Sequence, residues 1–479
     1  MAEISEKAVS EVKQSWISFQ TSRGTEVQAT PLRLNRHQAV FELYSPNVVL
    51  QTSEVLGEFT IVCQDRTLFS GRAVVQNLVN TGLMVVCDAA LDDGWRDVDF
   101  VVAAGHGDKL CDGFKDFVRD WEKLYRVLPE FKSAIADLQT FLTDLRLWLE
   151  QVELGVRSAP AGDRVELERT VAHELQGPAV ESIQSLCERY EAVSRSIGAD
   201  LQPVHQAFAR RQLHPLMLCS PFIYRTLRKP LGYAGDYEVV NMMFRDPCEG
   251  SSLFAKIMNA YALQLPPIVA HRHRIAYLVE RLQAETLRAA RSARKARILD
   301  VGCGPAHEIQ NFLRQNSLCD QAQFTLVDFE EEALAYVGKT LEALKKQHGR
   351  QTAIELKRNS VLQILKESAK SVQGANGNQF DFAYCAGLFD YLPDRVCRQI
   401  VELLYQKVAP GGLVVVTNVD QNPSRIQMES FLEWHLIYRS AERLAKLAPE
   451  YVSPEAVSLK CDGATGVNIF LEIRKPERV

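Results

Sequence analysis

The residues best suited to chemistry form a short glycine-rich run in the last third of the chain. Asp300 stands two residues before Gly302, and Gly304 and Ala306 follow at alternate positions. A dinucleotide fingerprint, Gly-x-Gly-x-x-Gly, needs glycine where this chain has His307. A carboxylate before the first glycine repels a pyrophosphate and attracts an amine. The run therefore predicts a ligand with an α-amino group and a sulfonium rather than two phosphates.

Further polar groups follow at the ends of two apolar segments. Residues 324–328 read as a strand that ends in the carboxylate of Asp328, and residues 353–358 read as a strand followed by Asn359 and Ser360. The carboxyl ends of parallel strands share one edge of a sheet, where nucleotide ligands bind. We therefore expect these polar side chains beside the glycine run.

Strands and helices alternate from residue 296 onward, which predicts a parallel sheet with right-handed crossovers. Five strands are expected before the last helix, at 297–301, 324–328, 353–358, 380–384 and 412–418. The last helix is expected over 431–447, and the runs 457–460 and 467–473 are typical of a closing hairpin. The predicted fold class is α/β, with a Rossmann-like sheet of seven strands.

Residues 297–473 resemble a class I S-adenosylmethionine-dependent methyltransferase in the order and content of these motifs. The stretch 380–391 resembles the fourth motif of that family, and 409–416 resembles the turn and strand after it. The resemblance implies S-adenosylmethionine as the cofactor. It implies that the glycine run holds the methionine part, that the acid at 328 binds the ribose, and that the polar pair after the third strand meets the adenine. It also implies that the backbone after the fourth strand borders the transferred methyl group. The implied cofactor-binding residues are Asp300, Gly302, Gly304, Ala306, Asp328, Phe329, Asn359, Ser360, Cys385, Ala386 and Gly387.

Two further segments are expected to form the pocket for the methyl acceptor. Segment 229–237 has two glycines, two tyrosines and an acid in nine residues, and segment 422–439 follows the fifth strand, where the family often places a substrate cap. An ordinary loop and plain core packing are the competing interpretations. The predicted catalytic residues are Tyr233, Asp236 and His435, and the predicted acceptor-binding residues are Tyr233, Trp434, Tyr438 and Arg439.

Over residues 200–475 the chain also resembles a bacterial group that makes 3-hydroxypalmitic acid methyl ester. This resemblance implies O-methylation of a fatty-acid carboxylate, which is already a nucleophile at neutral pH and needs positioning rather than a base. One alternative is an N- or O-methyltransferase of another small metabolite, with Tyr233, Asp236, His271 or His435 as the base. Another is a non-catalytic cofactor-binding scaffold or sensor. For His271 and His273, in the run His-Arg-His-Arg274, a solvated basic face is the favoured interpretation.

The N-terminal region predicts a small β-barrel, with strand-like runs at 40–44, 57–63, 70–76 and 83–87 separated by turn residues. It resembles a PilZ-type barrel, which implies arginines on an N-terminal arm and an Asp-x-Ser-x-x-Gly turn. Arg33 and Arg36 match the arm, but Asn77, Val79 and Gly82 align with the turn, so the acid and the serine are missing. A structural or protein-interaction barrel is therefore favoured over a cyclic-dinucleotide sensor, which stays open.

Composition bounds the remaining functions. The 479 residues carry a net charge of −5, which argues against a nucleic-acid partner. The chain has no apolar run long enough to span a membrane and no secretory signal layout, so a cytoplasmic protein is expected. Eleven cysteines without a Cys-x-x-Cys pair predict neither a metal site nor disulfides.

The expected partners are a small-molecule acceptor and, through the N-terminal and helical regions, a second copy of the chain or another protein. A changing periodicity along the chain predicts four consecutive domains. They are a β-rich PilZ-like domain at 1–108, a helical connector at 109–198, a helical substrate-cap region at 199–292 and an S-adenosylmethionine-binding methyltransferase domain at 293–479.

Overall fold

The chain forms two compact units that interleave along the sequence. The computed structural model describes residues 15–35, 37–43, 50–63, 66–80, 85–92, 115, 127–361, 363–365 and 379–477. Unit 1 comprises Met1–Ala234, Cys248–Ala262 and Ile426–His435, and unit 2 comprises Gly235–Pro247, Leu263–Arg425 and Leu436–Val479. The four consecutive domains expected from the sequence divide the chain differently, and they stay predictions.

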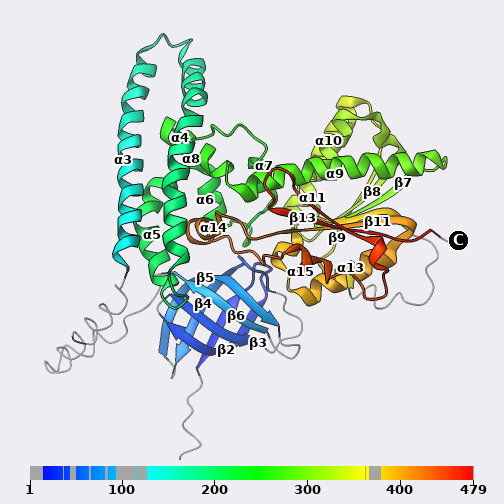
Figure 1. Ribbon diagram of the computed structural model, residues 1–479, viewed down its shortest axis with the longest axis horizontal. Helices are drawn as coiled ribbons and strands as arrows, with labels where there is room; N and C mark the ends of the chain where they lie inside the picture. The colour runs from blue at the N-terminus through cyan, green and yellow to red at the C-terminus, as the bar shows by residue number, and fades with distance from the viewer. Residues whose placement is uncertain are drawn as a thin grey trace, which may run out of the picture. The chain divides into compact units, whose positions relative to one another are not determined.

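Unit 1 begins with a closed barrel of antiparallel strands in the order β1-β2-β3-β6-β5-β4 (Figure 1). Alternate side chains face inward, and Phe59 lies at the centre, with its ring centroid 5.7 Å from that of Phe19 and 6.1 Å from that of Phe69. The predicted small β-barrel is confirmed. Arg36 and Gly82 lie outside the described residues. The strands are β1 (Trp16–Gln20), β2 (Glu26–Asn35), β3 (Gln38–Leu43), β4 (Val55–Cys63), β5 (Arg66–Asn80) and β6 (Val85–Leu91).

The other elements described in unit 1 are helices. The two long helices α3 (Pro129–Ser158) and α4 (Arg164–Arg195) run side by side as a hairpin (Figure 1). Helix α3 starts with proline at its first position, where no intrahelical N–H bond is lost, and buries one row of apolar side chains. The shorter helices are α5 (Gln202–Met217), α6 (Pro221–Arg228), α8 (Leu253–Leu263) and α14 (Arg425–Phe431), whose first residue belongs to unit 2.

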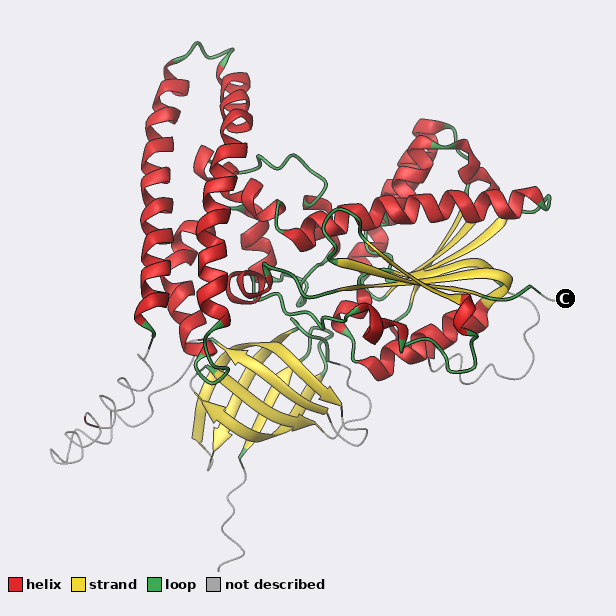
Figure 2. Ribbon diagram, viewed as in Figure 1, coloured by secondary structure: helices red, strands yellow, loops and turns green. Residues whose placement is uncertain are grey.

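Unit 2 is built on a seven-stranded sheet in the order β12-β13-β11-β10-β7-β8-β9. Figure 2 shows the strands of this sheet in yellow, with helices on both of its faces. The strands from β11 to β9 are mutually parallel, and β13 runs antiparallel to both β11 and β12. Each predicted strand is present, which confirms the class I methyltransferase fold. The strands are β7 (Ala296–Val301), β8 (Ala322–Asp328), β9 (Ala353–Arg358), β10 (Phe380–Cys385), β11 (Val408–Val419), β12 (Val457–Cys461) and β13 (Asn468–Arg474).

Helices cover both faces of this sheet. On one face, α9 (Pro266–Arg291), α10 (His307–Gln315) and α11 (Glu331–His348) share an apolar core with β7, β8 and β10. On the other face lies α13 (Asp394–Lys407), which packs on β10 and β11 (Figure 1). The remaining elements are α7 (Tyr237–Met242), α15 (Ala441–Ala445) and the 3₁₀ turns η1 (Ser317–Gln321), η2 (Leu388–Tyr391) and η3 (Pro454–Ala456). None of the described helices is long and apolar enough to cross a membrane.

The helix predicted over 431–447 is wrong. Helix α14 ends at Phe431, residues 433–440 are not helical, and α15 covers only Ala441–Ala445. Glu433 adopts a left-handed backbone conformation (φ +48°), and its buried carboxylate accepts hydrogen bonds from Arg72 and Arg210. Both arginines belong to unit 1 but lie far away in the sequence, so local periodicity could not reveal them.

We expect Asp381→Asn to lower the free energy of unfolding by about 1–3 kcal/mol. Asp381 is 2% exposed, accepts a 2.9 Å hydrogen bond from the backbone N–H of Arg297 and pairs with Arg294. The amide removes the charge from this interior position. Urea denaturation measures the change. The control Glu355→Gln, whose side chain is 60% exposed on β9, should change stability by less than about 0.5 kcal/mol. Equal losses in the two variants would contradict this role.

Candidate functional site

The glycine-rich run forms a tight loop between β7 and α10. Gly302 (φ +80°) donates its N–H to the carbonyl of Val327 at 2.8 Å, and Gly304 (φ +49°) follows in the same left-handed region. A side chain at Gly304 would meet no atom within 4 Å, so open space lies over this part of the loop. Ala306 (φ +50°) directly precedes α10 and adopts a conformation that favours glycine. The loop therefore lets a ligand approach its backbone closely.

Asp328, at the end of β8, holds this loop. One carboxylate oxygen accepts the N–H of Gly304 at 2.9 Å, and the other accepts the N–H of Glu330 at 3.0 Å. The backbone carbonyl of Asp328 accepts the N–H of Asn359 at 3.0 Å, which joins the end of β9 to the same point. Burial raises the pKa of the carboxyl, and the backbone bonds from Glu330 and Gly304 oppose that rise. Each oxygen has further lone pairs with which to accept a diol.

The other predicted cofactor residues lie at the same edge of the sheet. Phe329 directly follows β8, and Asn359 and Ser360 follow β9. Ser360 starts a short turn, in which its N–H donates to the side chain of Gln363 at 2.7 Å. Cys385, Ala386 and Gly387 follow β10, and the N–H of Gly387 (φ +96°) donates to the Thr417 hydroxyl at 3.1 Å. Because β10, β7, β8 and β9 are consecutive neighbours, their carboxyl ends bring all eleven residues to one edge.

Two buried acids lie beneath the loop. Asp300 on β7 is 2% exposed, and Glu308 in the first turn of α10 is also buried. The hydroxyl of Tyr384 donates to Glu308 at 2.9 Å. Burial, together with the neighbouring Glu308, raises the pKa of Asp300 well above its usual value, and burial also raises the pKa of Glu308. One carboxylate oxygen of Asp300 has no hydrogen-bond partner among the described residues.

The match to a known family coincides with this site. Residues 270–450 match a family described as a methyltransferase domain. This part of the chain is an S-adenosylmethionine-dependent methyltransferase domain. The matched residues begin within α9 and end after α15, so they include the glycine loop and the ends of β8, β9 and β10. A comparison with curated proteins gave no match.

Solved structures similar to this methyltransferase have low sequence identity. A possible exported protein from Bordetella parapertussis is 15% identical, with 64% of this chain and 97% of that chain covered and a TM-score of 0.40. The N-methyltransferase NodS from Bradyrhizobium japonicum WM9 is 16% identical, over 42% and 97%, with a TM-score of 0.26. Magnesium protoporphyrin IX methyltransferase from Synechocystis PCC 6803 is 10% identical, over 43% and 84%, with a TM-score of 0.31. These scores are too low to argue acceptor identity from.

The residues at the sheet edge fit S-adenosylmethionine. The unpartnered oxygen of Asp300 is an acceptor suited to an ammonium group, and the carboxylate of Asp328 is suited to a ribose diol. The open space over Gly304 leaves room for a ligand to contact the backbone of the loop. The cofactor supplies an electrophilic methyl group, and the chain supplies binding and orientation. Assignment of individual residues to parts of the cofactor stays a prediction.

The predicted acceptor residues are divided between the two units. Asp236, Tyr438 and Arg439 belong to unit 2 with the glycine loop, and Tyr233, Trp434 and His435 belong to unit 1. The backbone N–H of Trp434 donates to the carbonyl of Met428 at 3.0 Å, and the backbone of His435 bonds with the Ser53 hydroxyl. The catalytic and acceptor-binding roles of these six residues therefore stay predictions.

Two of the six have evident framework contacts. Asp236 caps α7, because one carboxylate oxygen accepts the N–H groups of Glu238 and Val239, both at 2.9 Å. Arg439 is fully buried, and its guanidinium donates to Asp394, to Asn418 and to the backbone carbonyls of Phe389 and Leu392. These contacts fill the donors of Arg439 and leave none for an acceptor, so we do not include Arg439 in the proposed acceptor site.

Sequence reasoning missed Arg274. This arginine ends the run whose two histidines were interpreted as a solvated basic face, yet it is only 6% exposed. The solvated-face interpretation agrees with His273, whose side chain is 40% exposed and lies 2.9 Å from Asp462. It does not agree with His271, which is half-buried against Arg274. The available signal was helical spacing, because Arg274 precedes the buried Leu278 and Leu282 at intervals of four.

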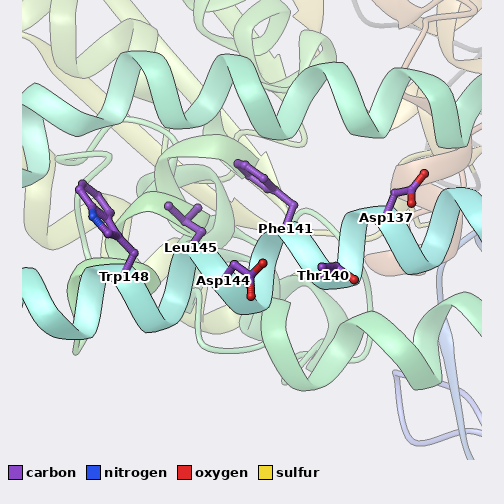
Figure 3. A pocket seen from close by; sticks show the side chains of 6 residues that line it. All are labelled: Asp137, Thr140, Phe141, Asp144, Leu145 and Trp148. Atoms are coloured by element: carbon purple, nitrogen blue, oxygen red, sulfur yellow. The ribbon is translucent and has the colours of Figure 1, made fainter.

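A groove beside α3 contributes nothing to this site. It has a volume of about 550 Å³ and belongs to unit 1. None of the predicted cofactor or acceptor residues lines it. Its lining side chains, shown in Figure 3, are Asp137, Thr140, Phe141, Asp144, Leu145 and Trp148.

We expect Asp328→Ala to raise the Kd for S-adenosylhomocysteine by about 10- to 100-fold, since bonds to a charged group are each worth roughly 1.5–3 kcal/mol. The variant loses the carboxylate oxygens that are expected to accept the ribose diol. It also loses the hydrogen bond that holds the backbone of Gly304. Isothermal titration calorimetry measures the change. The matched control is Asp320→Ala, because Asp320 bonds Gln351 and Thr352 before the start of β9, at the opposite ends of the strands. Unchanged affinity in Asp328→Ala would contradict the assignment.

We expect Asp300→Asn to gain thermal stability relative to the parent as pH rises. An unfolded aspartate titrates near ~3.9, whereas burial and Glu308 raise the folded-state pKa of Asp300 well above that. In the parent, the contribution of Asp300 to folding stability is therefore fully present below about pH 4. It is lost as pH rises toward the folded-state pKa of Asp300. The asparagine does not titrate, so its Tm should exceed the parent's by more at pH 8 than at pH 5, while its affinity for S-adenosylhomocysteine falls.

Differential scanning fluorimetry at both pH values checks this prediction. The control is Asp137→Asn on the exposed side of α3, where the carboxylate pairs with Arg189 at the surface. The Tm of this control relative to the parent should not grow with pH. A stability difference for Asp300→Asn that is the same at pH 5 and pH 8 would show that Asp300 is already ionised in the folded protein.

Proposed function

We propose that this methyltransferase forms a methyl ester on the carboxylate of a fatty-acid-type acceptor, such as a 3-hydroxy fatty acid. The observation that supports the proposal is the low basicity of the His271 imidazole, which lies near the end of β10. His271 accepts a 2.7 Å hydrogen bond from Arg274, whose guanidinium lies against Gly387. Burial, together with Arg274, lowers the pKa of His271 well below its usual value. Such an imidazole is a weak base, which suits an acceptor that needs no deprotonation.

Two other polar groups of unit 2, the candidate base Asp236 and the nearby His307, support the same conclusion. Asp236 is occupied as a helix cap. Burial lowers the pKa of His307 to about 4, and the ring stacks on Phe244 at 4.2 Å. A carboxylate acceptor is ionised at neutral pH without help. Its oxygen forms a bond to the methyl carbon as the carbon–sulfur bond breaks, and no proton has to move. The chain then contributes orientation and the exclusion of water.

Unit 1 has a less specific proposed role. Arg33, which matches the PilZ arm, and Asn77, which stands in place of the acid of the PilZ turn, are exposed on the barrel. Arg33 lies 3.5 Å from Gln38, and Asn77 accepts the N–H of Leu78. We assign the barrel a structural or protein-interaction role. Its PilZ likeness, a second copy of the chain as partner and a cytoplasmic location stay predictions.

Incubation with methyl-labelled S-adenosylmethionine and 3-hydroxypalmitic acid should give a labelled methyl ester, detected by mass spectrometry. The matched control acceptor is 3-hydroxypalmitamide, which has the same chain but no carboxylate and should stay unlabelled. The turnover number should change little between pH 6 and pH 9, because the acceptor is ionised throughout. Label in the amide, in an amine or in protein would contradict the carboxylate proposal, while leaving the methyltransferase domain itself intact.

A further inference from the structure

We propose that Arg274 and His271 form a carboxylate-binding pair beside Gly387 in unit 2. Arg274 lies on the buried side of α9. A Cβ atom on Gly387 would lie 2.9 Å from Nη2 of Arg274 and 3.1 Å from Nη1, so the guanidinium rests directly against this backbone. Only glycine permits that approach. The pair is thus placed at the end of β10, where the family resemblance puts the transferred methyl group.

The protein leaves the guanidinium incompletely satisfied. Among the described residues, Nε has no hydrogen-bond partner, and Nη1 lies 3.8 Å from the nearest oxygen of Asp390, beyond hydrogen-bonding distance. The other oxygen of Asp390 accepts the backbone N–H of Val419 at 2.7 Å. Buried arginines normally fill their donors, as Arg439 does in the same unit. A carboxylate offers two acceptor oxygens whose spacing matches two N–H groups of the guanidinium.

His271 positions the guanidinium. Its ring nitrogen Nδ1 lies 2.7 Å from Nη2 of Arg274, and its lowered pKa keeps the ring neutral and able to accept that bond. Phe244 contacts His271 edge-on at 6.2 Å and stacks on His307, whose Nε2 lies 3.0 Å from the amide oxygen of Asn241. This chain of contacts from α7 to α9 and α10 fixes the ring. His271 is therefore a positioning residue rather than a base.

Two carboxylates have the required chemistry. One is the methionine carboxylate of the cofactor, and the other is the carboxylate of the acceptor. The acceptor form of the inference rests on the proposed function, whereas the cofactor form does not.

The test compares Arg274→Gln with the parent in two measurements. Calorimetry gives the Kd for S-adenosylhomocysteine and for its decarboxylated analogue, and steady-state kinetics gives KM for 3-hydroxypalmitate. If the pair binds the cofactor carboxylate, the Kd for S-adenosylhomocysteine should rise about tenfold or more, and that for the analogue should not change. If it binds the acceptor, both Kd values should stay constant and KM should rise by about the same factor.

A second Arg274 variant, a His271 variant and a surface control show whether any change in Kd or KM comes from the proposed pair. Arg274→Lys retains the charge but loses the two-pronged geometry, so it should show most of the same effect if the glutamine variant does not fold. His271→Gln should show a smaller effect in the same parameter. Arg291→Gln, at the exposed end of α9, is the control and should leave all values unchanged. Parent-like values in every Arg274 variant would overturn the inference, whereas a parent protein that methylates only amines would overturn the proposed function alone.

Discussion

The interaction on which the cofactor side of unit 2 depends is the bond between the Asp328 carboxylate and the backbone of Gly304. Through its two oxygens and its own carbonyl, this residue joins the loop after β7 to the ends of β8 and β9. The loop has left-handed residues at the alternate positions Gly302, Gly304 and Ala306, and the alanine adopts this conformation at a cost. A buried acceptor at the end of the neighbouring strand offsets that cost. The same carboxylate therefore shapes the loop and keeps lone pairs that can accept further hydrogen bonds.

Buried charges in this chain have different consequences because they differ in how fully they are paired. Glu433 in unit 1 accepts from Arg72 and Arg210, and these cations hold its pKa at about 2 in spite of burial. This charge is compensated within the chain, so its role is to fix the backbone of a segment without regular structure. Arg274 and Asp300 in unit 2 keep unpaired polar atoms in the interior. Incomplete pairing is costly in a folded protein, and it is expected where a ligand completes the site.

Most of unit 2 could be predicted from the sequence, because its strands are short apolar runs and its loop has a distinctive acid and glycine spacing. What could not be predicted depends on partners distant in sequence. The segment 433–440 has helical spacing of large side chains, yet Glu433 and Arg439 are held by residues that are tens to hundreds of positions away. Arg274 was missed because a run of alternating basic residues resembles a solvated face. The division into units was also invisible, since no composition change marks Ile426 or His435.

The interleaving of the two units has a consequence for how the chain is made. Tyr190 packs on Phe431, with ring centroids 5.2 Å apart, and its hydroxyl donates to Ser430 at 2.8 Å. Both partners are synthesised after five strands of the unit 2 sheet. Unit 1 therefore cannot complete its interior while it emerges from the ribosome, although it contains the N-terminus. Its helices must wait, with apolar surface uncovered, until a segment embedded in the sequence of unit 2 arrives.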